Sequence, residues 1–435
     1  MSRIIPRCVV IQALAVVLSI LFSAAEARSE SYKVLYNFNS TNANPSSGLI
    51  VDGAGNAYGT TAQGGNDHSG TVYELSPTTG YHLLFAFSNA GHGGKHPQGN
   101  LVFDSVGNLY GTTVSGGVDK TECSNQGCGV VFELSPPSTN GGLWTETVLY
   151  SFCSQADCAD GAEPQAGVAI DALGNLYGTT FIGGNPGCQE EGPGCGTVFE
   201  LSLTESGWIE SVIHEFVIGN GAFPRGSLIF DTAGNLYGTT ASGGQENGGT
   251  VFELSLIGGV WNQSVIYDFN GSSGSTDGCS PEAGLTLDAA GNLYGTTAVG
   301  GSSGSGNGSG FGTVFELSPM SGQWVESILY SFTGGDDGAN PESTLTLDAI
   351  GNLYGTTLAG GGALGCNRVG CGTIFELTPN GGEWLESLFR FPVNGQLGTQ
   401  PNSQLFFNSD GKIYGTTMAG GAKGANDGVL FGIAR

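Results

Sequence analysis

The chain has 435 residues and a formal net charge of −26, with 78 glycines but also 39% hydrophobic and 10% aromatic residues. Disordered chains lack such apolar content, so this chain can form a hydrophobic core despite its glycines. A strongly acidic surface repels phosphate backbones and anionic lipids, which excludes nucleic acid as a partner and leaves cations, glycans or other proteins.

Residues 1–27 have the pattern of a secretory signal peptide. Arg3 and Arg7 precede an apolar run over residues 9–22, and "SAAEARSE" follows it. A charged segment, a short apolar run and small residues are typical of such a peptide, and we expect cleavage after Ala27. The run is shorter than the roughly 20 residues that a membrane span needs. We therefore expect a mature, monomeric chain of residues 28–435 with no membrane span, secreted or located in the periplasm.

Seven copies of a four-segment unit follow. Their shared phrase is "GNLYGTT" or a close variant, and it starts at Gly55, Gly107, Gly174, Gly234, Gly291, Gly351 and Gly411. A short apolar segment precedes the phrase, and segments such as "GTVFEL" and "SVIYDF" follow it. All four are short, rich in β-branched and aromatic residues, and bounded by Gly, Pro or Asn, which predicts strands. The units begin near residues 48, 100, 167, 227, 284, 344 and 404, so the chain is predicted to be an all-β repeat protein.

The two ends of the repeat array predict a closed ring. The last unit stops at Arg435 without a fourth segment, whereas an orphan fourth segment, residues 32–38, precedes the first unit. This orphan strand can pair with the last third segment, residues 428–433, and complete its sheet. We therefore predict one seven-bladed β-propeller with four-stranded blades, in which the N-terminal strand completes the last blade.

Side chains that repeat with the unit are expected to have structural roles. Aspartates in "DALGN"-type segments begin tight hairpins between the first and second strands. Tryptophans open five fourth strands and are expected to pack between blades. Glutamates in the third strands are expected to accept hydrogen bonds from Thr hydroxyls or backbone N–H groups rather than bind metal.

Nine cysteines follow the predicted cleavage site, and eight of them form close pairs. The pairs are Cys123/Cys128, Cys153/Cys158, Cys188/Cys195 and Cys366/Cys371. In an exported protein such pairs indicate local disulfides. A zinc site is the alternative, but "CSNQGC" and "CNRVGC" lack histidines and the usual spacing. Cys279 is left unpaired.

The units "GNLYGTTxxGG…GTVFELSP" and "W.ESVLYSF" resemble the GloVer tandem repeat of exported bacterial proteins, over residues 32–435. The resemblance implies an exported bacterial protein with a propeller-like domain, and it implies no activity and no catalytic residues. Members of this family are described as choice-of-anchor proteins because their C-terminal sorting signals differ. Nothing like an anchor follows "GVLFGIAR" here, so we expect free secretion or periplasmic residence.

The loops joining second to third strands, and fourth strands to the next blade, are long, variable and on one face. Loops on a rigid scaffold commonly carry binding residues. A metal could bind His68, His92, His96 and Asp67, although exposed loop polarity is the favoured explanation of these residues. Calcium could bind Asp160, Asp277, Asp336 and Asp337, although Asp-Gly is also common in turns. Phe223 could stack on a sugar ring.

Motifs of common enzymes, such as GxSxG, HExxH and the P-loop, do not occur in the sequence. Catalysis needs different roles from neighbouring residues, whereas departures from the repeat are expected only in loop length and cysteine pairs. We therefore predict an exported, non-enzymatic scaffold that needs no cofactor and binds an extracellular protein or glycan through its long-loop face. The alternatives are a polysaccharide lyase or glycoside hydrolase acting at the channel mouth, and a structural component of the envelope.

Overall fold

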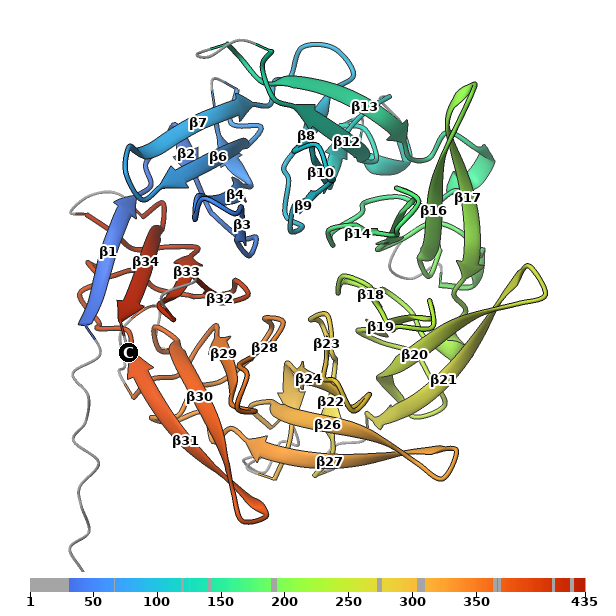
Figure 1. Ribbon diagram of the computed structural model, residues 1–435. Helices are drawn as coiled ribbons and strands as arrows, with labels where there is room; N and C mark the ends of the chain where they lie inside the picture. The colour runs from blue at the N-terminus through green and yellow to red at the C-terminus, as the bar shows by residue number, and fades with distance from the viewer. Residues whose placement is uncertain are drawn as a thin grey trace, which may run out of the picture.

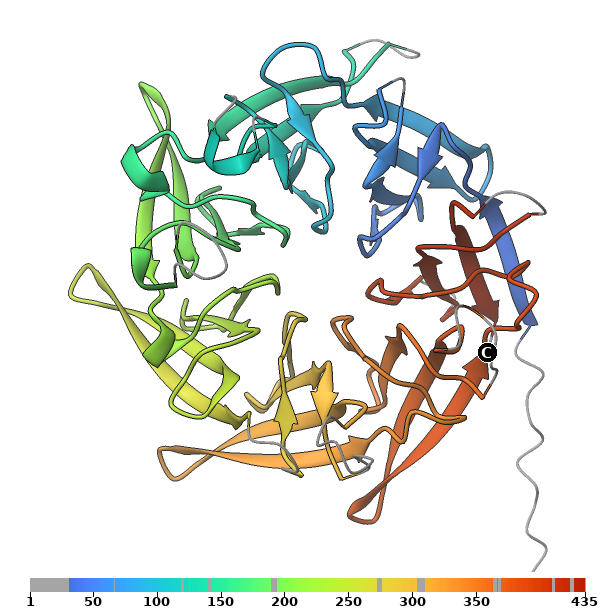
Figure 2. The same ribbon diagram turned by 180° about the vertical axis from the view of Figure 1, so that it is seen from behind.

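The computed structural model describes residues 31–434, except 66, 119–120, 125, 139–141, 189–193, 272–275, 303–309, 363–365, 367–368, 409–410 and 423–425. The predicted signal peptide lies outside the described residues. Seven antiparallel four-stranded sheets in the described part of the chain form blades around a common axis (Figure 1 and Figure 2). The prediction of a seven-bladed propeller is confirmed. Helices in these ranges are too short and too polar to cross a bilayer.

Each blade runs from a two-residue inner strand to a longer outer strand. Blades one to three are β3 (Ile50–Val51), β4 (Ala57–Thr61), β6 (Thr71–Ser76), β7 (Gly80–Ala86); β9 (Val102–Phe103), β10 (Leu109–Thr113), β12 (Val130–Ser135), β13 (Thr145–Ser151); and β14 (Ala169–Ile170), β15 (Leu176–Thr180), β16 (Thr197–Thr204), β17 (Gly207–Glu215). Blades four to six are β18 (Ile229–Phe230), β19 (Leu236–Thr240), β20 (Asn247–Ile257), β21 (Val260–Asn270); β23 (Thr286–Leu287), β24 (Leu293–Thr297), β26 (Thr313–Met320), β27 (Gln323–Ser331); and β28 (Thr346–Leu347), β29 (Leu353–Thr357), β30 (Thr373–Asn380), β31 (Glu383–Arg390).

The seventh blade combines the two ends of the chain. It consists of β32 (Phe406–Phe407), β33 (Ile413–Thr417), β34 (Val429–Ala434) and β1 (Ser31–Asn37). The remaining elements lie in the loops: β2 (Asn42–Ala43), β5 (Gln63–Gly64), β8 (Gly94–Lys95), β11 (Ser115–Gly116), β22 (Gly278–Cys279), β25 (Val299–Gly300), and the 3₁₀ turns η1 (Thr121–Cys123), η2 (Ala156–Cys158), η3 (Pro186–Cys188) and η4 (Ile218–Asn220).

The N-terminal strand closes the ring with the same contacts that join the other blades. β1 pairs antiparallel with β34, and the two strands lie side by side in Figure 1. Just beyond β1, the buried ring of Phe38 packs on Tyr73 of the first blade, with 5.3 Å between centroids. Phe87 packs on Phe132 in the same way at the next junction, at 5.2 Å. The predicted closure by the N-terminal strand is therefore confirmed.

The repeated phrase "GNLYGTT" forms the second strand of each blade, and its contacts explain why it recurs. A Cβ at Gly178 would lie 2.5 Å from Cζ of Phe199, so only glycine allows this close approach. The Tyr177 hydroxyl lies 3.0 Å from the Glu200 carboxylate, and the hydroxyls of Thr180 and Thr197 are 2.8 Å apart. Tyr177, Gly178 and Thr180 of the phrase therefore each have a defined partner in the neighbouring strand.

The repeated acidic residues organise turns and strands, with one correction to the expected partners. Asp171 accepts hydrogen bonds from the backbone N–H groups of Leu173 and Asn175, as expected for a hairpin aspartate. Glu200 accepts from the hydroxyls of Tyr177 and Ser202. The expectation of Thr or backbone donors is wrong, because the strand register places Tyr177 opposite Glu200.

The tryptophans pack between blades as expected. Trp208 lies with its ring centroid 6.3 Å from Tyr110 of the preceding blade, in an edge-on arrangement. Trp261 lies 6.0 Å from Tyr177 in the same geometry. Core packing therefore accounts for these rings.

Candidate ligand site in the channel

A proline precedes the first strand of every blade, and the residue before it has a left-handed backbone conformation in all seven units. These residues are Asn44, His96, Glu163, Phe223, Ser280, Asn340 and Gln400, with φ between 54° and 60°. Backbone hydrogen bonds hold these residues in this unfavourable conformation. The N–H of Phe223, for example, donates to the carbonyl of Cys195, and its own carbonyl accepts from the N–H of Ala241. The backbone is thus constant at a position where the side chain varies.

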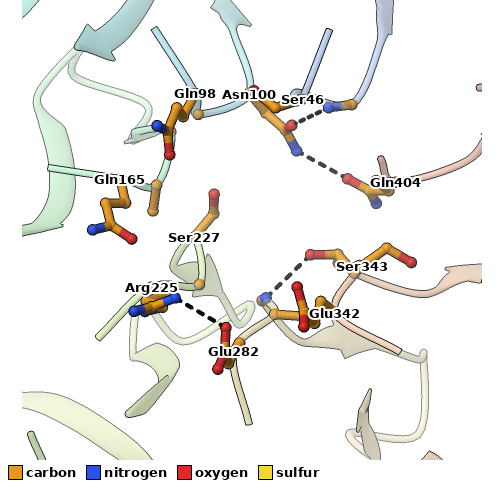
Figure 3. Close-up of a pocket in the computed structure, with 18 of the residues that line it drawn as sticks. Ser46, Gln98, Asn100, Gln165, Arg225, Ser227, Glu282, Glu342, Ser343 and Gln404 are labelled. Carbon is orange, nitrogen blue, oxygen red and sulfur yellow. Dashed lines mark hydrogen bonds and ion pairs between the residues drawn. The ribbon is translucent and has the colours of Figure 1, made fainter. Parts of the chain in front are cut away.

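The residue after each proline faces the central channel, and we call these seven residues the post-proline ring. They are Ser46, Gln98, Gln165, Arg225, Glu282, Glu342 and Asn402, and all line one cavity of about 180 Å³ (Figure 3). They belong to the segments that lead from the long-loop face into the innermost strands. The cavity therefore lies on the axis, where all seven blades contribute to it.

Charged residues are gathered on one side of this ring. Arg225 forms an ion pair with Glu282 at 3.1 Å (Figure 3). Its guanidinium lies 4.7 Å from the centroid of the Phe181 ring. Burial and the negative charge of Glu282 raise the pKa of Glu342 to about 7, although Arg225 acts in the opposite direction. Glu342 can thus hold a proton near neutral pH beside an ion-paired carboxylate.

Amide and hydroxyl groups complete the lining. Asn100 accepts a hydrogen bond from the N–H of Gly48 and donates one to Gln404, which links the second blade to the first and the seventh (Figure 3). In the described part of the chain, the buried Ser46 Oγ and Asn402 Oδ1 have no hydrogen-bond partner. The cavity therefore presents both donors and acceptors to a polar ligand.

Sequence reasoning missed the post-proline ring. The expectation that departures from the repeat are limited to loop length and cysteine pairs is wrong here, because neighbouring blades carry Arg225, Glu282 and Glu342 at one equivalent position. A signal was available in the sequence, since the prolines recur in every unit while the residue after them changes. That this position faces the channel depends on the tertiary structure.

The histidine-rich loops of the first blade are held by other contacts. Nδ1 of His92 lies 3.3 Å from the carbonyl of Gly117, and Nδ1 of His96 lies 2.9 Å from that of Ala62. Asp67 accepts hydrogen bonds from the Ser88 hydroxyl and the Asn89 N–H, and these bonds lower its pKa. His68 has a positive φ of 57°. In the described ranges the structure does not bring these residues into a three-ligand cluster.

The four candidate calcium ligands belong to three different blades, and none lines the channel cavity. Asp160 is fully buried and accepts hydrogen bonds from the Tyr150 hydroxyl and the Ser154 N–H. Asp277 and Asp337 have equivalent tyrosine and backbone donors in their own loops. Asp336 forms an ion pair with Arg390 at 3.7 Å. The loop contacts of these carboxylates are structural, and calcium binding stays a prediction.

The remaining predicted site residues are Phe223 and the cysteines. Phe223 is only 8% exposed and packs on Phe181 at 5.3 Å, so its ring is not a free stacking surface. The structure contains all four predicted disulfides, which join Cys123–Cys128, Cys153–Cys158, Cys188–Cys195 and Cys366–Cys371. Cys279 is free. Such disulfides are typical of proteins that fold in an oxidising compartment.

A family model described as the Gloeobacter/Verrucomicrobia repeat matches residues 19–159, 119–309 and 304–435. The chain belongs to the Gloeobacter/Verrucomicrobia repeat family. The sequence resemblance to GloVer repeats is thereby confirmed. A comparison with curated proteins found no match.

Solved structures similar to this Gloeobacter/Verrucomicrobia repeat protein are distant in sequence. The extracellular domain of a candidate one-component system from B. thetaiotaomicron is 10% identical, with a TM-score of 0.50, and the match covers 93% of this chain and 40% of that one. A candidate 6-phosphogluconolactonase from Bacteroides uniformis is 15% identical, with a TM-score of 0.48, over 80% of this chain and 84% of that one. At such identities the likeness concerns the fold alone.

Proposed function

We propose that the protein is an exported, non-enzymatic propeller that binds the end of an extracellular glycan in its channel cavity. The observation that carries this proposal is the post-proline ring, where different polar side chains stand on a constant backbone around one cavity. Sugar hydroxyls both donate and accept hydrogen bonds, and the ring offers amides, hydroxyls, carboxylates and a guanidinium. A cavity of about 180 Å³ has room for several ordered waters. This volume suits one small polar group better than a folded protein segment.

A glycan-cleaving activity is the second candidate, and one observation favours it. Glu342, with a pKa raised to about 7 by burial and by the charge of Glu282, can act as a general acid at neutral pH. Glu282, paired with Arg225, is a carboxylate that can serve as the base or nucleophile. Glycoside hydrolysis needs such a pair of carboxyl groups with different protonation states.

The test is a glycan array with the purified chain, run once with calcium and once with EDTA. We expect binding of at least one glycan, equal in both conditions, because the candidate calcium aspartates lie outside the cavity. Arg225→Gln should weaken this binding at least tenfold by removing the only cation of the post-proline ring. Arg390→Gln is the matched control, since Arg390 also pairs with a carboxylate but lies away from the cavity, and it should bind normally.

Glu342→Gln separates the two candidate functions. A pure binding site should tolerate this change within about threefold, because the amide keeps the shape and can still form hydrogen bonds. Shortened glycans produced by the native chain but not by Glu342→Gln would establish the enzyme instead. If the chain bound no glycan on the array in either condition, the glycan proposal would be contradicted and a protein partner favoured.

A further inference from the structure

The junction between the seventh and first blades differs from the others. In the phrase "GNLYGTT" and its variants, six of the seven tyrosines are buried, with at most 8% of their surface exposed: Tyr58, Tyr110, Tyr177, Tyr237, Tyr294 and Tyr354. Tyr414 on β33 is only half-buried. The difference lies in what surrounds this ring, because the strand itself pairs as in the other blades.

Four departures from the repeat meet around Tyr414. Ala57 stands where the other units have Leu or Ile, and Gly432 stands opposite Tyr414 where the other third strands have Glu. Asn408 replaces the hairpin aspartate, and Oη of Tyr414 lies 3.4 Å from its Nδ2. The hairpin of the first blade ends early, with Ser76 opposite Gly80, so it carries no tryptophan. Each change removes a bulky or acidic side chain from the same junction.

The result is a cavity of about 390 Å³ between the two blades, which we call the seam pocket. Leu35, Ala57, Leu75 and Tyr414 contribute apolar walls, and the exposed Lys33 and Lys412 lie at its rim. The volume falls within the ~300–1,000 Å³ typical of small-molecule sites. It is also more than twice the volume of the channel cavity.

The charge of the seam pocket is opposite to that of the equivalent junctions. In the third blade the tyrosine hydroxyl lies beside two carboxylates, those of Asp171 and Glu200. At the seam both positions are uncharged, as Asn408 and Gly432, and two lysines line the site. The whole sequence has only 12 Lys and Arg residues against 38 Asp and Glu. Two cations at one pocket of so acidic a protein favour an anionic ligand.

We propose that the seam pocket binds a small aromatic carboxylate. The aromatic ring occupies the space that a tryptophan of the fourth strand fills at other junctions, against the face or edge of Tyr414. The carboxylate lies at the rim, where Lys33 and Lys412 provide positive charge. This site is independent of the channel cavity and of the function proposed for it.

The experiment titrates the purified chain with indole-3-acetate by calorimetry, with neutral indole as the comparison. We expect saturable one-to-one binding of indole-3-acetate, at least tenfold tighter than that of indole. Ala57→Leu restores the residue found in the other units and fills part of the pocket. It should weaken binding at least tenfold, while the midpoint of thermal unfolding stays equal to or above that of the native chain. A loss of binding would then not be due to misfolding.

The double variant Lys33→Gln, Lys412→Gln tests the charge of the pocket. It should reduce the affinity for indole-3-acetate about tenfold and leave the affinity for indole unchanged. Lys95→Gln, on β8 in another part of the ring, is the matched control and should behave like the native chain. The absence of saturable binding by the native chain would overturn the proposal. Binding that persists unchanged in Ala57→Leu would also overturn it, because the ligand would then occupy another site.

Discussion

At the scale of single residues, the fold depends on close contacts that recur in every blade. The glycine of "YGTT" is the clearest case, because the ring of the third-strand aromatic residue occupies the space a side chain would need. For Gly178 the ring atom is Cζ of Phe199, 2.5 Å from a built Cβ. The backbone at this glycine is ordinary, so its role is to allow packing and not to supply a positive φ.

Gly178→Ala is therefore expected to destabilise the protein by about 1–3 kcal/mol, the usual cost of overpacking a well-packed core. Urea unfolding measures the change in the free energy of unfolding. Gly53→Ala is the matched control, since no heavy atom lies within 4 Å of a Cβ built there, and it should stay within about 0.5 kcal/mol. Equal effects of the two substitutions would refute the packing explanation.

At the scale of the element, the fourth strands bring buried carboxyl groups to the blade junctions. Glu210, Glu326 and Glu386 stand two residues after the tryptophans of their blades. Burial, assisted by the negative charge of an aspartate in the preceding blade's loop (Asp160, Asp277 or Asp337), raises the pKa of each to about 7. In Glu386 a hydrogen bond from Tyr330 acts in the opposite direction. Acid pairs at these junctions thus hold protons that the unfolded chain would release.

This arrangement sets the direction of the pH dependence of stability. The ordinary pKa of these groups is 4.5, so between pH 4.5 and about 7 the folded chain binds more protons than the unfolded chain. Stability contributed by these groups is complete below pH 4.5 and falls as the pH rises through that window. Hairpin aspartates such as Asp52 and Asp231 have lowered pKa values, so their contribution is lost only below about pH 3.8. We expect greatest stability near pH 4 to 5.

Glu326→Gln should flatten this profile and raise the Tm at pH 8 by roughly 1–3 °C. The fourth blade already has glutamine at this position, Gln263, which donates a hydrogen bond to the carbonyl of Asn220. Thermal melts from pH 4 to pH 8 measure the effect. Glu205→Gln, in the exposed hairpin between β16 and β17, is the control and should leave the profile unchanged. A Glu326→Gln profile that matches the native one would rule out this origin of the pH dependence.

At the scale of the whole molecule, stability depends on joining the two ends of the chain in one blade. β1 covers the edge of β34, which would otherwise present unpaired backbone groups to solvent. Phe38 packs on Tyr73 of the first blade. Phe216 packs in the same way on Phe252 at the junction between the third and fourth blades. The N-terminal strand is therefore as much a part of the core as an internal strand.

Phe38→Ala should cost about 3–5 kcal/mol of unfolding free energy, because the ring is 1% exposed and leaves a cavity when removed. Phe216→Ala, at the equivalent position of an internal blade, should cost a similar amount. Chemical denaturation of both variants makes the comparison. If Phe38→Ala left the free energy of unfolding unchanged while Phe216→Ala lowered it, β1 would not close the ring in solution.

The sequence by itself determined the architecture of this protein. Strand identity follows from local patterns, since short segments rich in β-branched and aromatic residues form strands. Blade number and closure follow from the repeat, because the four-strand unit recurs every 52 to 67 residues and an orphan fourth strand precedes the first unit. The disulfides also follow from local spacing. Only the tertiary structure decided where the polar cavities lie, because Arg225, Glu282 and Glu342 are about 60 residues apart and meet only when the blades surround one axis. The seam pocket likewise needs Ala57 and Tyr414, from opposite ends of the chain, to meet at the junction where the ring closes.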